Sequence, residues 1–360
     1  MKILEITSEL DGGGVDRLLY DYCSRMSPDI HFDYVVTSDF KGILEDPLER
    51  IGSSVYHLPP FRKQPLVHIR RLKQLYATNN YDIIHDHSGY KSFLSLIIAL
   101  ICGVKVRIAH SHQADIPESF VNWLIRKFCT FITVIVATDL FACGEKAAIW
   151  MWGRSRRKRV HIMTNAIEVD KFQFSNETRS RYRKMFDVED KIVLGNVARF
   201  SHQKNHEFLL KMFREYHTIV PNSVLLLVGR GELFEDTKLL ADRLNIVDSV
   251  IFLGVRDDVS NILNAMDLFV LPSFHEGLPV TLVEVEANGL ASVVSDSVTG
   301  EMKINRNVYY YPLHIGAKQW AINITKINSF NRDSSSFDTS DYNIEIASLK
   351  MKKFYLEKKH

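Results

Sequence analysis

The sequence predicts an α/β protein with two Rossmann-like domains, each a doubly wound parallel sheet covered by helices. Short aliphatic segments alternate with longer segments of helical periodicity, which is typical of repeated β-α units. The alternation begins again at Lys191, so the chain contains two such series. Its 360 residues also exceed the usual size of one domain. Ligands of such folds bind at the carboxyl ends of the strands, and we expect the two domains to face each other across a cleft.

The first series lies within residues 1–165, which we assign to an amino-terminal domain. Helical periodicity separates its strands, for example at Pro65–Ala77 and Gly89–Ile101. A basic, mixed segment around Val160–Ala166 ends the series. The expected strands are Lys2–Thr7, Phe32–Thr37, Ser54–His57, Asp82–His85, Lys105–Ala109 and Leu140–Ala142.

The second series lies within residues 166–340, which we assign to a carboxyl-terminal domain. Helical segments follow Lys204, Glu232, Val255 and Pro279. A polar stretch near residues 329–341 leads to an amphipathic helix, and we expect residues 341–360 to pack back on the amino-terminal domain. The expected strands are Lys191–Val197, Ser223–Val228, Ser249–Leu253, Asp267–Leu271 and Ala291–Val294.

Composition and charge argue against several classes of protein. The formal net charge of +2 is too small to indicate a nucleic-acid partner, so we expect none. The four cysteines form no C-x-x-C pair and no zinc spacing, which favours free thiols in a reducing cytoplasm. No apolar h-region precedes the first strand, so we expect no signal peptide, and the apolar segment Phe128–Val136 is too short to span a bilayer. We therefore expect a cytoplasmic protein.

The segment E-G-L-P-V-T-L-V-E carries the strongest functional signal. A buried strand leads to a loop with Glu276, and Pro279 then occupies the first-turn position that proline favours in a helix. Glu284 lies about a turn and a half into that helix. The free N–H groups from Gly277 and Leu278 onward suit a phosphate or a sugar oxygen. The pattern therefore predicts a nucleotide-sugar site with a carboxylate at each end, rather than two unrelated surface glutamates.

Cations and glycines lie at other predicted strand ends. Arg199 and Lys204 flank the end of the first strand of the second domain. A guanidinium and an ammonium can neutralise a diphosphate leaving group as its bond to the sugar breaks. Gly13 and Gly14 belong to a glycine loop before the first helix, and a backbone without Cβ atoms can approach a phosphate closely. The glycine loop alone is a weak signal, because the G-x-G-x-x-G spacing of dinucleotide sites is absent.

Taken together, these motifs resemble the retaining glycosyltransferases of family 4, whose two-domain fold is called GT-B. The resemblance extends over most of the chain and becomes weaker after Asp296. In its detailed residue pattern the sequence is similar to bacterial enzymes of capsular or exopolysaccharide assembly. The matching segments are Glu276–Glu284 with Ala287–Gly289 and Val293–Asp296, Gly195–Asn205, Leu226–Glu232, Asn165–Glu168 and Gly12–Gly14.

The resemblance implies a role for each motif residue. Glu276 would hold hydroxyls of the donor sugar, and Glu284 would hold the ribose. Arg199 and Lys204 would bind the diphosphate, which Gly13 and Gly14 would cover from the other domain, where the acceptor binds. Retention of anomeric configuration is implied as well. No residue of the motifs is an obvious covalent nucleophile, so attack on the face that the leaving group vacates is the expected route.

Histidines follow two strands of the first domain. His110 and His112 come after the strand Lys105–Ala109, and the resemblance implies a functional histidine there, with His112 matching better by spacing. A buried, hydrogen-bonding histidine is the alternative for either position. The run His85-Asp86-His87 looks like metal chemistry but is better interpreted as polar residues at a strand end. Which of His110 and His112 is functional stays open.

We expect transfer of a sugar, from a UDP-sugar in particular, to a saccharide or lipid-linked saccharide acceptor. No D-x-D pair occurs in the sequence, so we expect no cofactor and no divalent metal, and the cations would handle the leaving-group charge. A nucleotide-sugar epimerase on the same fold and an inactive scaffold subunit of an assembly complex remain alternatives. A dinucleotide oxidoreductase is disfavoured because its fingerprint is missing.

Two basic segments suggest contact with a membrane. Arg154–Arg159 holds five cations, and Trp123–Phe131 places Arg126 and Lys127 among aromatic and aliphatic residues. A lipid-linked acceptor would require the protein to work at the inner leaflet of the plasma membrane. We therefore expect peripheral contact with anionic lipid, with a solvated basic surface as the alternative.

Overall fold

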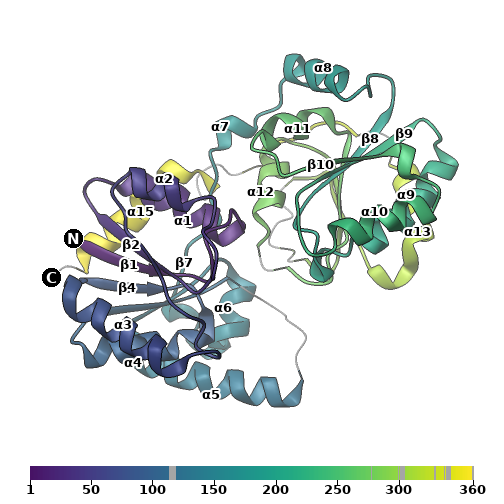
Figure 1. The fold of residues 1–360 in the computed structure, drawn as a ribbon. Helices are drawn as coiled ribbons and strands as arrows, with labels where there is room; N and C mark the ends of the chain where they lie inside the picture. Colours follow the sequence, from purple (N-terminus) through teal and green to yellow (C-terminus); the bar gives the residue numbers. More distant parts are fainter. Residues whose placement is uncertain are drawn as a thin grey trace. The chain divides into compact units, whose positions relative to one another are not determined.

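The computed structural model describes residues 1–112, 119–276, 278–298, 300, 305–327, 330–335, 337 and 342–358. The chain divides into two compact units, Met1–Ile167 with Ser340–His360 (unit 1) and Glu168–Thr339 (unit 2). Each unit has a parallel sheet and a hydrophobic core of its own (Figure 1). The prediction of two α/β domains with doubly wound parallel sheets is confirmed.

Unit 1 contains a seven-stranded sheet in the order β3-β2-β1-β4-β5-β6-β7. Every neighbouring pair is parallel. The strand order reverses between β1 and β4, and the carboxyl ends of strands on either side of such a reversal are where ligands of this architecture bind. The strands are β1 (Lys2–Ile6), β2 (His31–Val36), β3 (Val55–His57), β4 (Ile83–Asp86), β5 (Val106–Ser111), β6 (Asp139–Ala142) and β7 (Val160–Ile162).

Helices cover both faces of this sheet (Figure 1). On one face α1 packs against α15, and on the other α3, α4, α5 and α6 pack in succession. The helices of unit 1 are α1 (Gly14–Met26), α2 (Glu45–Arg50), α3 (Pro65–Asn79), α4 (Phe93–Ile101), α5 (Phe120–Val136), α6 (Glu145–Trp152) and α15 (Ile344–Glu357), with 3-10 helices η1 (Gly89–Ser92) and η2 (Arg154–Arg159).

Helix α15 completes the core of unit 1 although it follows unit 2 in the chain. It begins after Asn343, whose side chain accepts hydrogen bonds from the N–H groups of Glu345 and Ile346. Its buried apolar residues recur at helical spacing, so one stripe of the helix faces the core. They are Ile344, Ala347, Met351 and Tyr355.

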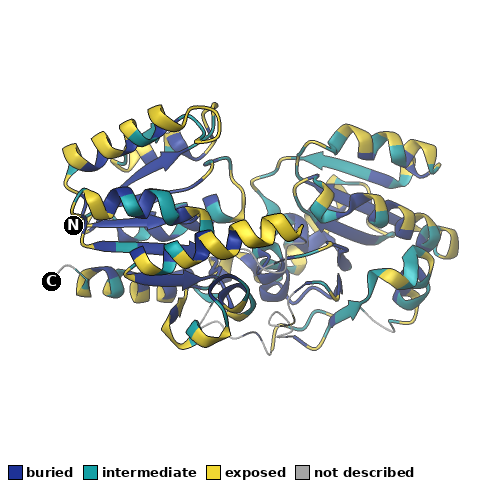
Figure 2. Cartoon of the chain, turned by 90° about the horizontal axis from the view of Figure 1, so that it is seen from below, coloured by how far each residue is buried: buried dark blue, intermediate teal, exposed yellow. Residues whose placement is uncertain are grey.

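Helix α5 presents an apolar face to solvent, which Figure 2 shows as a largely exposed helix. No acidic residue occurs between Ser119 and Thr138. Of the two cations of this segment, Lys127 is exposed and Arg126 is buried. The Arg126 residue is 5% exposed because its long stem packs inward, and its guanidinium carbon Cζ lies 4.3 Å from the centroid of the Trp150 ring. The exposed residues of this apolar face are Phe120, Val121, Trp123, Leu124, Ile125, Phe128, Phe131 and Ile135.

Unit 2 contains a six-stranded parallel sheet in the order β10-β9-β8-β11-β12-β13. Its strands are β8 (Ile192–Val197), β9 (Ser223–Val228), β10 (Val250–Gly254), β11 (Leu268–Leu271), β12 (Ser292–Ser295) and β13 (Val308–Tyr311). Its helices are α7 (Val169–Phe172), α8 (Asn176–Met185), η3 (His202–Lys204), α9 (His206–Ile219), α10 (Phe234–Arg243), η4 (Val247–Ser249), α11 (Val259–Ala265), α12 (Val280–Ala287), η6 (Leu313–Ile315) and α13 (Gly316–Thr325).

Two strands lie outside the predicted set. β7 and β13 are edge strands of three and four residues, and most of their side chains are partly exposed. Short strands without a buried face lack the apolar pattern that identifies strands in sequence. The segment Val160–Ala166, expected as a boundary, therefore supplies a last strand to unit 1.

Candidate functional site

The loop after β11 holds a largely buried ion pair. The Glu276 side chain is 7% exposed, and its Oε1 accepts a hydrogen bond from Lys204 Nζ at 2.5 Å. Gln203 Nε2 donates to the other carboxylate oxygen at 3.3 Å. β8 and β11 are neighbours in the sheet, so the loops at their carboxyl ends meet although these residues lie 72 positions apart. The structure thus brings together two of the predicted site residues, an acid and a cation.

Further hydrogen bonds fix these two loops to each other. Gln203 Nε2 also donates to the His275 carbonyl at 2.8 Å, and Phe274 N–H donates to the Gln203 carbonyl at 2.9 Å. Asn205, with φ of 57°, accepts from Phe208 N–H at 3.3 Å as the N-cap of α9. Its Nδ2 donates to the Pro272 carbonyl at 3.2 Å. The ion pair is therefore held in place before any ligand binds, as preorganised charge stabilisation requires.

Arg199 lies at the same edge of the sheet in a different setting. Its side chain is 64% exposed, and Nε donates to Glu232 Oε2 at 3.4 Å. The backbone of the β9–α10 loop approaches closely here, since a Cβ atom on Gly231 would lie 2.4 Å from the Phe200 carbonyl oxygen. Glycine is needed at that position because any side chain would collide with fixed backbone. Arg199 thus remains accessible, whereas Lys204 is withdrawn into its pair with Glu276.

Helix α12 carries the other carboxylate of the motif. Glu284 is half-buried on its second turn, and Leu278, before the helix, is 7% exposed. Gly277 lies outside the described residues. The structure corrects the expectation for Pro279, which is the N-cap in extended conformation and not a first-turn residue. The shift by one position follows from its ψ of 120°, which is not helical.

The glycine loop of unit 1 is closed by an aspartate. Gly12 has φ of +82°, Gly13 is the N-cap of α1, and Gly14 is its first residue. Asp16 Oδ2 accepts hydrogen bonds from the N–H groups of Asp11 (3.1 Å) and Gly13 (3.0 Å). Burial raises the pKa of the Asp16 carboxyl to about 6. The Gly13 N–H therefore already has a carboxylate acceptor, and its contact with a donor phosphate stays a prediction.

Two H-x-H segments on neighbouring strands place four histidines together. His85 and His110 lie on β4 and β5, and His87 and His112 follow these strands directly. Alternate residues of a strand share one face, so all four rings gather on one side of the sheet. The ring centroids of His110 and His112 are 4.0 Å apart, and those of His85 and His87 are 4.2 Å apart.

Glu5 on β1 connects the histidines into two hydrogen-bonded chains. Its Oε2 lies 2.7 Å from His87 Nε2, and His87 Nδ1 lies 2.8 Å from His112 Nε2. Its Oε1 accepts from the Tyr355 hydroxyl at 3.2 Å, which lies 2.6 Å from His85 Nδ1. Burial holds the pKa of His85, His110 and His112 well below the usual histidine value, and the neighbouring imidazoles add to that effect. Glu5 and Tyr355 were not predicted as site residues.

The histidine cluster also meets a distance criterion for metal ligation. Nitrogen atoms of His85, His87 and His110 lie within 4.8 Å of one another. However, the rings of His85 and His110 are stacked at 13°, and both nitrogens of His87 are engaged with Glu5 and His112. An ion would have to displace these hydrogen bonds and reorient the rings. The arrangement therefore favours a hydrogen-bonded network over a metal site.

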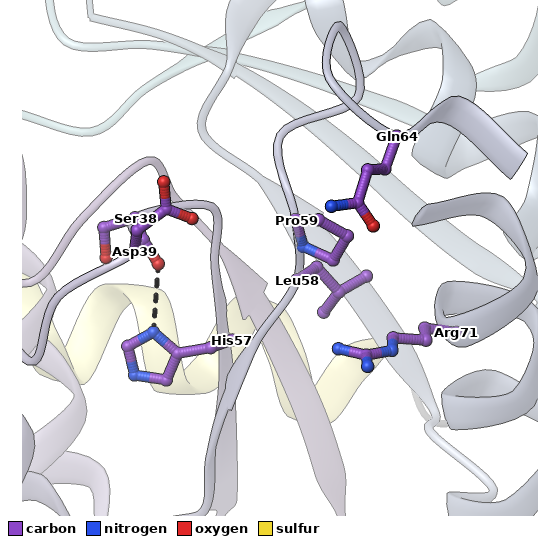
Figure 3. A pocket seen from close by; sticks show the side chains of 7 residues that line it. All are labelled: Ser38, Asp39, His57, Leu58, Pro59, Gln64 and Arg71. Carbon is purple, nitrogen blue, oxygen red and sulfur yellow. Dashed lines mark hydrogen bonds between the residues drawn. The ribbon is translucent and has the colours of Figure 1, made fainter. Parts of the chain in front are cut away.

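A pocket of about 330 Å³ lies beside the carboxyl ends of β2 and β3. Figure 3 shows His57 bonded to the Ser38 carbonyl on one side, at 3.1 Å, and Gln64 and Arg71 on the other. Neither Gln64 nor Arg71 has a side-chain partner among the residues that the structure describes. The pocket is lined by Ser38, Asp39, His57, Leu58, Pro59, Gln64 and Arg71. Such polar groups match the donors and acceptors of a saccharide.

Sequence families divide the chain much as the structure does. Residues 12–171 match Glycosyltransferase Family 4, and residues 178–334 match Glycosyl transferases group 1. The first match lies almost wholly in unit 1 and the second in unit 2. Each unit thus has its own relatives among glycosyltransferases.

Individual relatives extend over much of the chain. It is 29% identical over 307 residues to a putative glycosyltransferase, EpsF, of Bacillus subtilis, covering 83% of this chain and 80% of that one. It is 24% identical to the capsular polysaccharide biosynthesis glycosyltransferase CapH of Staphylococcus aureus, covering 99% of both. It is 27% identical to the Escherichia coli UDP-Gal:alpha-D-GlcNAc-diphosphoundecaprenol alpha-1,3-galactosyltransferase, covering 62% of this chain and 60% of that one.

The fold has close counterparts among solved structures. Anabaena HepE in complex with UDP and glucose superposes with a TM-score of 0.82, covering 99% of both chains at 19% identity. At that identity the likeness concerns the fold, and it agrees with the GT-B architecture that the sequence predicts. Fold, family matches and relatives agree with one another, and the chain belongs to the glycosyltransferases that join a family 4 amino-terminal domain to a group 1 carboxyl-terminal domain.

Proposed function

We propose that the protein is a retaining glycosyltransferase that uses a UDP-sugar and acts in polysaccharide biosynthesis. The Lys204–Glu276 ion pair at the carboxyl edge of the second sheet carries this proposal. Glu276 would bind hydroxyls of the donor sugar while Lys204 and Arg199 contact the diphosphate, and Glu284 would bind the ribose. The UDP in the names of the E. coli relative and of the HepE complex supports the choice of nucleotide.

In the proposed reaction, the bond between the anomeric carbon and the leaving phosphate oxygen breaks as the acceptor hydroxyl oxygen bonds to that carbon from the same face. The acceptor proton passes to the departing phosphate. Lys204 and Arg199 stabilise the negative charge that develops on the diphosphate. Glu276 holds the Lys204 ammonium in one position, so this cation needs little reorganisation as negative charge develops on the diphosphate.

We propose transfer without a divalent metal, because the sequence contains no D-x-D pair and offers two cations for the leaving group. The test is transfer by dialysed protein in excess EDTA, which we expect to proceed at the rate of the untreated protein. Loss of transfer that Mg²⁺ or Mn²⁺ restores would contradict the proposal.

A saccharide or lipid-linked saccharide is the proposed acceptor, bound by unit 1 near the histidines. The diphosphoundecaprenol in the name of the E. coli relative supports a lipid-linked acceptor. The pocket with Gln64 and Arg71 offers hydrogen-bond donors for one sugar residue of such an acceptor. We expect Arg71→Ala to raise the acceptor KM while the donor KM is unchanged.

We also propose peripheral attachment to anionic membrane through the apolar face of α5. No helix among the described residues is long and apolar enough to cross a bilayer. The exposed aromatic and aliphatic residues of α5 suit shallow insertion beside lipid headgroups. Lys127 on the same helix and the exposed Arg154, Lys158 and Arg159 of η2 would each add about 1 kcal/mol near an anionic surface.

Sedimentation with vesicles tests the attachment. Wild type should sediment with phosphatidylglycerol vesicles at low salt and be released as salt rises. Leu124→Gln with Phe128→Gln should abolish sedimentation, whereas Lys353→Gln, at an exposed site on α15, should not. If the wild-type protein does not sediment with anionic vesicles at low salt, the proposed membrane role of α5 is wrong.

A donor screen separates the proposed function from its alternatives. We expect UDP-sugars to raise the melting temperature more than other nucleotide sugars, because ligand binding stabilises the folded state. Product analysis with a lipid-linked saccharide mixture should then show an extended acceptor with its anomeric configuration retained. Conversion of the donor without an acceptor would indicate an epimerase, and no binding at all would indicate a scaffold subunit.

A further inference from the structure

Two ring nitrogens of the four-histidine cluster make no hydrogen bond within the described part of the chain, and they differ in their exposure to solvent. His110 is fully buried, and its Nε2 has no hydrogen-bond partner among the residues that the structure describes. His112 is half-buried, and its Nδ1 makes no hydrogen bond within the described part of the chain. His112 follows the end of β5, at the edge where ligands of this architecture bind. Of the two histidines, only His112 is therefore placed to meet a substrate.

The hydrogen-bond chain from Glu5 determines which nitrogen of His112 carries the proton. An ionised Glu5 can only accept, so His87 Nε2 must donate to it. The Nδ1 atom of a neutral His87 then accepts from His112 Nε2. A neutral His112 that is protonated at Nε2 has a lone pair on Nδ1.

We propose that Glu5 and His87 are positioning residues that hold His112 in the Nε2-protonated tautomer, so that its Nδ1 accepts a hydrogen bond from an acceptor hydroxyl. The inference rests on the proposed function for the presence of that hydroxyl. The hydrogen bond to Nδ1 holds the acceptor through a hydroxyl other than the attacking one, because the attacking hydroxyl gives its single proton to the departing phosphate. His112 is then the residue that touches substrate, and Glu5 and His87 act through it.

The second branch from Glu5 supplies a matched comparison. The Tyr355 hydroxyl donates to Glu5 Oε1 and accepts from His85 Nδ1, and His85 Nε2 in turn accepts from His110 Nδ1 at 3.2 Å. This chain ends at the buried Nε2 of His110. It shares Glu5 with the His112 branch, but its other residues are all buried. Breaking it should leave the tautomer of His112 unchanged.

Two-bond ¹H–¹⁵N correlation spectra of imidazole-labelled protein test the tautomer directly. Wild type should show a protonated Nε2 and a pyridine-like Nδ1 for His112, and Tyr355→Phe should show the same. His87→Phe keeps a ring in the stack but cannot accept from His112, so its spectrum should show a mixture of tautomers. A wild-type His112 protonated at Nδ1 would overturn the proposal, whether or not the protein transfers sugar.

Kinetics test whether the tautomer matters for transfer. We expect His87→Phe to lower kcat by roughly 10-fold to 100-fold, below the full contribution of a catalytic acid–base group, with the donor KM nearly unchanged. Tyr355→Phe should stay within about three-fold of wild type, since it leaves the His112 branch intact. In a His112→Ala background the His87→Phe change should have no further effect, because both act through one group.

Two outcomes separate the proposals. An equal loss from His87→Phe with and without His112 would show a merely structural role and overturn the inference. A wild type that transfers no sugar from any nucleotide sugar would instead refute the proposed function, and the tautomer spectrum would still decide the hydrogen-bond chain.

Discussion

Lys204 and Glu276 depend on each other for charge balance. The Lys204 side chain is 20% exposed and that of Glu276 is 7% exposed, so neither ion is fully hydrated. Removing one partner leaves the other as a poorly solvated charge, which costs more than the pair itself contributes. The same two residues are proposed to bind the donor, so a change to either affects both folding and transfer.

Lys204→Ala should therefore lower both activity and stability. We expect a loss of roughly 2–4 kcal/mol in transition-state stabilisation, the scale of one preorganised charge. The free energy of unfolding should fall by about 1–3 kcal/mol because Glu276 loses its partner. Adding Glu276→Gln should restore stability without activity. Arg199→Ala is the matched control, since its exposed side chain should contribute to transfer but little to the melting temperature; an unchanged melting temperature in Lys204→Ala would contradict the pairing argument.

Asp16 should make stability depend on pH. Burial raises the pKa of its carboxyl from 3.8 to about 6, so the folded state binds this proton more tightly than the unfolded chain does. The contribution of Asp16 to the free energy of unfolding is then greatest below pH 4 and is lost as pH rises through 6. We expect Asp16→Asn to gain roughly 2.4 kcal/mol relative to wild type between pH 4 and pH 7.

Denaturant unfolding at a series of pH values measures this difference. The control is Asp236→Asn, at an exposed position of α10, which should follow wild type across the series. A constant difference between Asp16→Asn and wild type over this range would show that the Asp16 carboxyl titrates alike in both states.

Helix α15 contributes to unit 1 as an element, through packing and through charge. Tyr355 is 2% exposed and reaches the histidine network, and its burial raises the pKa of the phenol well above the usual value. Arg25 Nε donates to Glu345 Oε1 at 2.6 Å, and Lys358 Nζ donates to Asp139 Oδ1 at 2.6 Å. The helix is therefore tied to α1 and to β6 by its ends and to the core by its middle.

Neighbouring residues of α15 should respond differently to truncation. Tyr355→Ala should cost about 3–5 kcal/mol, because it empties a core position and leaves His85 Nδ1 without its partner. Leu356→Ala changes the next residue, which is 42% exposed, and should cost less than about 1 kcal/mol. Thermal unfolding followed by aromatic circular dichroism reports both. Equal effects would mean that α15 does not pack as described.

The elements themselves were largely predictable from the sequence. Segments in which apolar and polar residues alternate, and continuous aliphatic segments, predicted the central strands. The strands β7 and β13 are short and partly exposed, so they carry no such pattern. The repeated H-x-H could have indicated one cluster, since two adjacent strands present alternate residues to one face. Glu5 and Tyr355 are single polar residues 350 positions apart, so only the tertiary fold reveals their contact. The same holds for Lys204 and Glu276, because the sequence shows one cation and one acid but does not show that the two side chains form an ion pair.

At the scale of the whole molecule, both units use one architectural rule. In each, the side chains of the proposed site lie at or just beyond the carboxyl ends of the parallel strands. Unit 1 presents histidines and a polar pocket there, and unit 2 presents an ion pair. The proposed donor side thus presents a charged pair, whereas the proposed acceptor side combines histidines with a pocket that includes Asp39 and Arg71.

Stopping the chain after residue 342 should affect the two units unequally. Unit 1 would lose α15 and expose its core, so a hydrophobic dye should bind and amides of β1–β6 should exchange faster. Unit 2 serves as the internal control, since α15 belongs to unit 1, and its amides should keep wild-type protection. Fully protected unit 1 amides would show that α15 is dispensable.

The placement of α15 also has a consequence for biosynthesis. A ribosome releases the strands of unit 1 before the roughly 170 residues of unit 2, and α15 emerges only after both. At about 5–20 residues per second, unit 1 waits roughly 10–35 seconds in the nascent chain without the helix that covers its core. During that interval the surface around Tyr22 and Phe32 is open to other nascent chains and to chaperones. Crowding of ribosomes on one message should therefore reduce the yield of this protein more than that of a chain whose domains are each contiguous.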